Sequence, residues 1–145
     1  MTPQERAARS AKAMWAQDAA SKWLGMELGE VGEGSARLSL TVEPHHCNGH
    51  GICHGGVIFA LADSAFAFAC NSRNQSTVAQ QNQITYLAPG RLGETLTAQA
   101  NETSLQGRTG LTDVTVTGVD GRVIAQFRGL SRAIPGSLFD EGTEQ

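Results

Sequence analysis

The segment from His45 to Asn71, HHCNGHGICHGGVIFALADSAFAFACN, concentrates the residues of this chain that could do chemistry. All four histidines of the chain lie in its first ten residues, together with two of the three cysteines. Such crowding of possible ligands suggests a metal site. The residues that follow suggest a different chemistry, because a Gly-Gly pair precedes an apolar run that contains a single carboxylate, Asp63.

The metal hypothesis can be checked against ligand spacing. A structural zinc site needs four Cys or His ligands, often spaced C-x2–4-C and H-x3–5-H. Cys47, His50 and Cys53 could supply three ligands, and the candidates for a fourth are His45, His46 and Cys70. This arrangement matches no standard spacing, so the sequence predicts no metal in the site.

Asp63 interrupts the stretch FALADSAFAF, which has the composition of a buried helix. Its neighbours three and four positions away on a helix are all apolar, namely Phe59, Ala60, Phe66 and Ala67. A solvent-facing stripe around Asp63 is therefore hard to build, and burying an isolated carboxylate is costly. A carboxylate held in a partly dry pocket is a candidate for a general base or a nucleophile.

The pair Gly55-Gly56 is expected to open this helix, which is predicted to extend from residue 55 to about residue 70. The first turn of a helix has unpaired N–H groups and the positive end of the helix dipole. Glycine lets a ligand approach this backbone closely, so the N–H groups could stabilise the oxyanion that forms when a carbonyl is attacked. The alternative is that the two glycines only allow tight packing at a turn.

The spacing of these two features has a consequence for assembly. Gly55 and Asp63 are eight residues apart, which is about 12 Å along one helix. A base and an oxyanion donor must meet at one carbonyl, with reacting atoms about 3–3.5 Å apart. If both residues act in one site, Asp63 of one chain must meet Gly55 of another across a two-fold axis. On this condition the sequence predicts an obligate homodimer.

The remaining chain contains elements that could position this helix. Residues 3–22 have helical spacing of apolar residues, with Met14 and Trp15 expected to pack on the body of the protein. Residues 23–28 form a short segment that ends at Gly29. Alternating apolar and polar residues predict strands over 36–42, 78–87, 94–103, 111–119 and 123–133. One long buried helix and an antiparallel sheet of five or six strands make an α+β fold.

Length and composition limit the classes of function. The 145 residues predict a single domain over 1–145, with an N-terminal helical extension over about 1–30 and a flexible tail over about 136–145. The net charge of −3 argues against nucleic acid as a partner. No apolar run approaches the about 20 residues that span a membrane. The N-terminus lacks the apolar core of a signal peptide, and three cysteines form no disulfide framework, so a cytoplasmic location is expected.

The motif N-x5-HGG-x5-AD, here Asn48, His54-Gly55-Gly56 and Ala62-Asp63, resembles the hot-dog fold acyl-CoA thioesterases, in particular the PaaI type of phenylacetate catabolism. The likeness extends over ITYLAPGRLGETLTA (84–98) and AQFRGLSR (125–132). It implies a central helix wrapped by a curved antiparallel sheet, a dimer that joins two sheets edge to edge, and a homotetramer. It also implies hydrolysis of phenylacetyl-CoA or hydroxyphenylacetyl-CoA to the free acid and CoA, with no cofactor.

The resemblance assigns roles to individual residues. It implies that Asp63 activates water or attacks directly, that the Gly55 N–H stabilises the oxyanion, and that His54 and Asn48 position the thioester and water. Related enzymes often place a Ser or Thr helper on the strand after the helix, but residues 78–83 contain no hydroxyl, so an amide could substitute: Gln80, Gln81 or Asn82. Further substrate contacts are expected from Gly56 and from arginines able to pair with CoA phosphates, namely Arg91, Arg108, Arg128 and Arg132.

Three other functions are compatible with the same residues. A thioesterase for short or medium aliphatic acyl-CoA would use the same groups on a different acyl chain. A hydratase or dehydratase of the same fold would place an acid or base beside a helix N-terminus. A non-catalytic acyl-CoA binding module would not need a carboxylate at the position of Asp63. The HGG sequence followed by a carboxylate in mid-helix favours hydrolysis.

Overall fold

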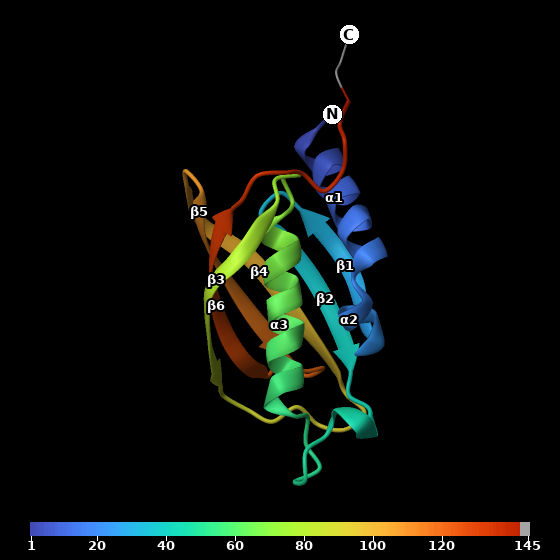
Figure 1. Cartoon of the computed structure of the whole chain (residues 1–145). Coiled ribbons are helices and arrows are strands. Elements are labelled where there is room, and N and C mark those ends of the chain that lie inside the picture. Colours follow the sequence, from blue (N-terminus) through green and yellow to red (C-terminus); the bar gives the residue numbers. More distant parts are fainter. Residues whose placement is uncertain (143–145) are drawn as a thin grey trace.

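The apolar segment 55–70 forms the helix around which the rest of the chain is built. In the structure, a computed structural model that describes residues 1–142, this segment is α3 (Gly55–Cys70). A six-stranded antiparallel sheet curves around α3, in the order β1-β2-β4-β5-β6-β3, and α3 contacts every strand (Figure 1). The strands are β1 (Met26–Gly32), β2 (Ser35–Thr41), β3 (Thr77–Tyr86), β4 (Thr95–Gln106), β5 (Thr109–Thr117) and β6 (Val123–Ala133). The predicted α+β fold is confirmed.

The sequence indicated only part of β1, the strand that precedes the first predicted strand. β1 runs through Gly29, where the sequence indicated an end, and continues to Gly32. The added Cβ of any other residue at Gly29 would lie 3.0 Å from the Arg37 carbonyl oxygen, so glycine here permits close approach of β1 to β2. Two strands, not one, therefore precede α3.

The core lies between α3 and the inner face of the sheet. Side chains that alternate along the strands point inward and are fully buried, as the pattern predicts; they include Leu38, Leu40, Leu96, Ala98, Ala100, Val114 and Val116. On α3, Phe66 packs against Phe127 of β6 with ring centroids 5.8 Å apart. Gly129 gives the Phe66 ring its room, because a Cβ at residue 129 would lie 2.5 Å from that ring. This packing fixes α3 against the strands that flank Asp63.

The N-terminal segment forms two helices instead of the single helix expected over 3–22. These are α1 (Pro3–Gln17) and α2 (Ala19–Trp23), and Asp18 separates them. The Asp18 carboxylate accepts hydrogen bonds from the Ser21 N–H and the Ser21 hydroxyl, so it caps the second helix and ends the first. The predicted packing of Trp15 is confirmed, since its ring lies 6.1 Å from that of Phe68 on α3.

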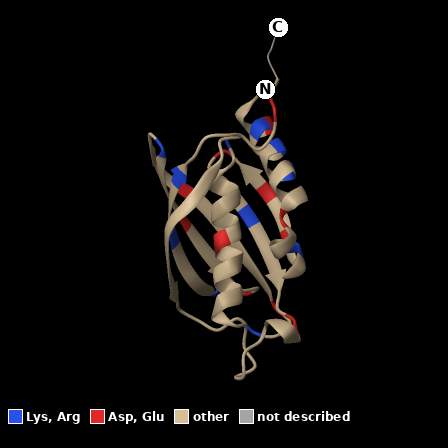
Figure 2. Ribbon diagram, in the orientation of Figure 1, with Lys and Arg blue, Asp and Glu red and all other residues tan. Residues whose placement is uncertain are grey.

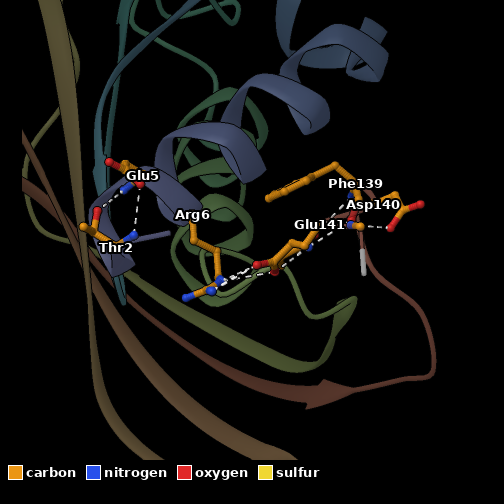
Figure 3. Close-up of polar contacts among 8 residues, drawn as sticks. Thr2, Glu5, Arg6, Phe139, Asp140 and Glu141 are labelled. Atoms are coloured by element: carbon orange, nitrogen blue, oxygen red, sulfur yellow. Dashed lines mark hydrogen bonds and ion pairs between the residues drawn. The ribbon is translucent and has the colours of Figure 1, made fainter. Parts of the chain in front are cut away.

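Part of the segment expected to be a flexible tail makes defined contacts with α1 (Figure 3). The Arg6 guanidinium donates to both carboxylate oxygens of Glu141, at 3.0–3.1 Å. Asn74 donates to the same carboxylate and accepts from the Phe139 N–H. These bonds lower the pKa of Glu141 to about 2, with the Arg6 hydrogen bond as the main cause. Residues 143–145, also assigned to the tail, lie outside the described residues.

The two edges of the sheet differ. α1 lies beside the edge strand β1, whereas β3 forms the other edge and pairs only with β6 (Figure 1). A register shift between Ala79 and Gln81 interrupts the β3–β6 ladder. Within residues 1–142, no helix is long and apolar enough to cross a membrane.

Candidate active site

Asp63 lies at the middle of α3 and is the only charged residue of that helix (Figure 2). Its side chain is half-buried, and the apolar neighbours Phe59 and Phe66 both pack on the Phe127 ring. Burial raises the pKa of Asp63, and a hydrogen bond from Asn82 lowers it in part. A carboxylate of raised basicity in a partly dry position is suited to take a proton from a nucleophile.

Asn82 on β3 is the residue that contacts Asp63. Its side-chain nitrogen donates to Asp63 Oδ1 at 2.9 Å. Its own oxygen, Asn82 Oδ1, is buried and has no hydrogen-bond partner among residues 1–142. A buried acceptor without a partner is energetically costly.

The other two amides that could replace the family's hydroxyl helper do not contact Asp63. Side chains alternate along a strand, and Gln81 lies on the outer face of the sheet, where it lines a shallow depression with Arg128. Gln80 is exposed and lies within the irregularity of β3. The structure thus brings Asn82 to Asp63 and leaves Gln80 and Gln81 away from it.

The N-terminal end of α3 has one free backbone donor. His54 is the N-cap, and its Nδ1 accepts from the Gly56 N–H at 2.8 Å. The His54 carbonyl accepts from the N–H groups of Val57 and Ile58, at 2.9 and 3.2 Å. Because the peptide bond is trans and planar, the Gly55 N–H then points the opposite way, out of the helix end. Among residues 1–142 it has no hydrogen-bond partner.

This geometry distinguishes between the two glycines. The Gly56 N–H is already committed to His54, so it is not available to a ligand unless that ring moves. The Gly55 N–H is available and lies at the positive end of the helix dipole. The Gly55 N–H is therefore the donor of this helix end that is open to a ligand, whereas the Gly56 N–H is bonded to the His54 ring.

The separation of Asp63 from Gly55 is as the sequence predicts, since both lie on one uninterrupted helix. Eight residues of helix span about 12 Å. Strand β3 runs alongside α3 and contacts it near both residues. Asn82 bonds to Asp63, and the Tyr86 hydroxyl donates to the Gly55 carbonyl at 2.8 Å. Four residues of strand span about 13 Å, which matches the helix distance. Tyr86 was not predicted as a site residue, because nothing in the sequence around the end of this strand indicates a contact with the start of α3.

Asn48 lies in the loop that leads to α3. Its side-chain oxygen accepts from the His50 N–H at 2.9 Å and from the Ile52 N–H at 3.4 Å, so it shapes the turn over 48–52. The loop is closed at its base by an antiparallel bridge between Cys47 and Cys53. The Asn48 amide nitrogen has no partner among residues 1–142 and remains available to a ligand.

The histidines and cysteines of this loop do not assemble as the metal hypothesis requires. Among residues 1–142, the ligand cluster that comes together is Glu43, His45 and His46. Both ring nitrogens of His46 already have partners, the Glu43 N–H at 3.0 Å and the Leu24 carbonyl at 2.7 Å. Burial raises the pKa of the Cys53 thiol to about 11, so it stays protonated at neutral pH. His46, Cys47 and Cys53 thus contribute to holding the loop, through the two His46 hydrogen bonds and the bridge between the cysteines.

The arginines expected to meet CoA phosphates lie in different places. Arg91 is exposed and pairs through its backbone with Ile52, two residues before His54, so it lies near the N-terminal end of α3. Arg128 is bound to Asp113 by two hydrogen bonds, at 2.6 and 2.9 Å, on the outer face of the sheet. This pairing lowers the pKa of Asp113.

The other two arginines lie at the opposite end of the molecule. Arg108 is in the turn between β4 and β5, and its carbonyl accepts from the Ala133 N–H. Ala133 pairs with Thr77, beside the C-terminal end of α3, and Arg132 is its neighbour in β6. Of the four arginines, the structure brings only Arg91 close to the helix end where the Gly55 N–H lies.

Comparisons with known proteins show the family of this chain. Residues 50–125 match the family described as the thioesterase superfamily. The acyl-coenzyme A thioesterase PaaI of Escherichia coli is 40% identical over 136 residues, which cover 94% of this chain and 97% of that protein. The solved structure of E. coli PaaI, from the phenylacetic acid degradation operon, superposes with a TM-score of 0.92 and covers 99% of that chain.

Two more distant solved structures also resemble this chain. A mutant PaaI from Thermus thermophilus is 34% identical, with a TM-score of 0.78, and covers 81% of this chain and all of that one. A Streptococcus mutans protein solved with acetyl-CoA is 26% identical, with a TM-score of 0.75, over 78% of this chain and 91% of that one. The chain therefore belongs to the thioesterase superfamily, as a hot-dog fold acyl-CoA thioesterase of the PaaI type.

Proposed function

We propose that this thioesterase hydrolyses aryl-acyl-CoA, phenylacetyl-CoA or hydroxyphenylacetyl-CoA, to the free acid and CoA. The acyl group is inferred from the E. coli relative, whose structure is described as coming from the phenylacetic acid degradation operon. The observation that carries the mechanism is a half-buried Asp63 and a free Gly55 N–H on the same helix. The reaction needs no cofactor, because a carboxylate and backbone donors supply all the groups that hydrolysis requires.

Asp63 activates the attacking water in this proposal, and Asn82 holds the carboxylate in place. With Asp63 Oδ1 bonded to the Asn82 amide nitrogen, Asp63 Oδ2 is the carboxylate oxygen left to accept a hydrogen from water. A water molecule that donates one hydrogen to Oδ2 keeps an oxygen lone pair for the thioester carbon. We propose this general-base role in preference to direct attack, because burial raises the pKa of the Asp63 carboxyl.

Hydrolysis proceeds by attack of water on the thioester carbon, followed by loss of CoA. The water oxygen bonds to the acyl carbon, its proton goes to Asp63, and the carbonyl electrons form an oxyanion that the Gly55 N–H stabilises. The C–S bond then breaks, and CoA leaves as a thiolate that takes the proton from Asp63. His54 and Asn48 lie on the same side as Gly55 and position the thioester, and Arg91 is the arginine placed to meet a CoA phosphate.

A homodimer is needed to complete this site. Asp63 and the Gly55 N–H are about 12 Å apart on one rigid helix, so the Gly55 that serves one Asp63 must come from a second chain. The uncovered edge strand β3 supports such pairing, because a long free strand edge is a template for another strand. Large apolar side chains at this edge are also exposed, namely Val78, Tyr86 and Leu87. We further propose that two such dimers form a homotetramer. We also propose that the enzyme is located in the cytoplasm.

Kinetics across a panel of acyl-CoA substrates test the acyl group. We expect kcat/KM for phenylacetyl-CoA and its ring-hydroxylated form to exceed the values for butyryl-CoA and hexanoyl-CoA by at least tenfold, since shape differences in an apolar pocket are worth about 10–200-fold. CoA release would be followed with a disulfide reagent, with an enzyme-only blank because Cys47 is only half-buried. A preference for the aliphatic substrates would replace the aryl assignment with the aliphatic one.

The Asp63→Asn variant tests the base. We expect turnover to fall at least a hundredfold, because the amide cannot accept the proton, and acid–base groups contribute about 10²–10⁴-fold. Circular dichroism and the oligomeric mass should be unchanged, since Asn has the same shape and can still bond to Asn82. Turnover near that of the wild type would exclude Asp63 as the base.

The Asn82→Leu variant tests the support of Asp63. The Asn82 hydrogen bond lowers the pKa of Asp63, so its loss should raise that pKa. The base must be ionised to act, and the acid limb of the kcat/KM profile should therefore move to higher pH. Gln83→Leu is the matched control, because Gln83 lies on the outer face of the same strand. An acid limb that stays in place in Asn82→Leu would show that Asn82 does not tune the base.

A further inference from the structure

The peptide between Gly55 and Gly56 is held at both ends by side chains. Its carbonyl, on Gly55, accepts from the Tyr86 hydroxyl at 2.8 Å, and its N–H, on Gly56, donates to His54 Nδ1 at 2.8 Å. One holding residue precedes α3, and the other comes from the end of β3. The first turn of α3 is thus fixed from two independent elements, directly beside the Gly55 N–H.

The Tyr86 ring also restricts what can stand at residue 55. A Cβ added to Gly55 would lie 3.3 Å from the Cζ and hydroxyl oxygen of Tyr86, which is tighter than ordinary contact. The ring therefore covers one side of the Gly55 α-carbon, while its hydroxyl binds the Gly55 carbonyl. The tyrosine is 48% exposed and lies at the free edge of the sheet.

We propose that Tyr86 is a positioning residue of the oxyanion hole. It holds the Gly55–Gly56 peptide against the edge strand, next to the His54–Gly55 peptide that carries the Gly55 N–H, and so helps to fix the first turn of α3 from which this N–H points. An oxyanion donor is effective only when it is aimed in advance at the place where charge develops. The same strand carries Asn82 four residues earlier, on the Asp63 side, so β3 positions the donor as well as the base. This inference rests on the proposed function of Gly55.

The Tyr86→Phe variant removes the hydroxyl and keeps the ring. One net hydrogen bond corresponds to about a 2- to 10-fold effect, so we expect kcat to fall by about that factor. KM and the affinity for a non-hydrolysable thioether analogue of the substrate should be unchanged, because neither involves an oxyanion. The midpoint of thermal unfolding should also stay within about 2 °C, since the bond lies at a partly exposed strand end.

Thr85→Val is the matched control. It deletes a hydroxyl from the adjacent residue, which lines the outer face of the sheet with Gln83 and Thr115. We expect its kcat to equal that of the wild type. A Tyr86→Phe enzyme with wild-type kcat would overturn the positioning role, and so would a loss of kcat that is matched by a lower unfolding midpoint and by weaker analogue binding.

The wild-type enzyme separates this inference from the proposed function. If the wild type hydrolyses no acyl-CoA, the proposed function and the role of Tyr86 both fail. If it is active and Tyr86→Phe is equally active, only the role of Tyr86 fails.

Discussion

The rigidity of α3 is the constraint on which the site depends. The proposed oxyanion donor, Gly55, and the proposed base, Asp63, lie on one uninterrupted helix of 16 residues, at positions eight residues apart. The hydrogen-bonded helix cannot bend to close the about 12 Å between them. The proposed mechanism needs both groups at one carbonyl, so in this proposal a second copy of the same helix supplies the missing half. The uncovered edge of β3 offers the surface for that second copy.

Strand β3 contacts α3 at both of these positions, Asp63 and Gly55. It runs beside α3, and its residues Asn82 and Tyr86 bond to Asp63 and Gly55. Four strand residues and eight helix residues span nearly the same length, so one strand can position both places at once. Burial against the strand and the phenylalanines raises the pKa of Asp63, and Asn82 limits that rise. The Asp63 carboxylate is therefore made more basic and still has a hydrogen-bond partner.

Much of this arrangement could be predicted from the sequence, because its signals are local. A carboxylate within an apolar helix and a Gly-Gly pair at its start indicated the two functional places, and strand alternation gave the sheet. Asn82 could not be chosen among three amides, because the register shift in β3 decides which of them faces α3. Tyr86 was missed because its role depends on the carbonyl it meets 31 residues away.

Several other features of the structure were also not predicted from the sequence. The break between α1 and α2 follows from a cap that Asp18 makes with Ser21, and such capping competes with continuing the helix. The contact of the tail with α1 depends on a charge pair between Arg6 and Glu141, 135 residues apart in the chain. The His and Cys residues of the loop drew attention by their number, yet in the structure they hold the loop together through buried and backbone contacts.

Activity recovered by mixing two inactive variants tests most directly whether sites are shared between chains. Asp63→Asn and His54→Ala would each be purified, shown to be inactive, mixed under conditions of verified subunit exchange, and assayed for CoA release. We predict recovery of about a quarter of wild-type turnover, because half of the randomly formed dimers are mixed and each has one intact site of two. Activity that stays at the level of the two inactive parents, despite exchange, would contradict a site built from two chains.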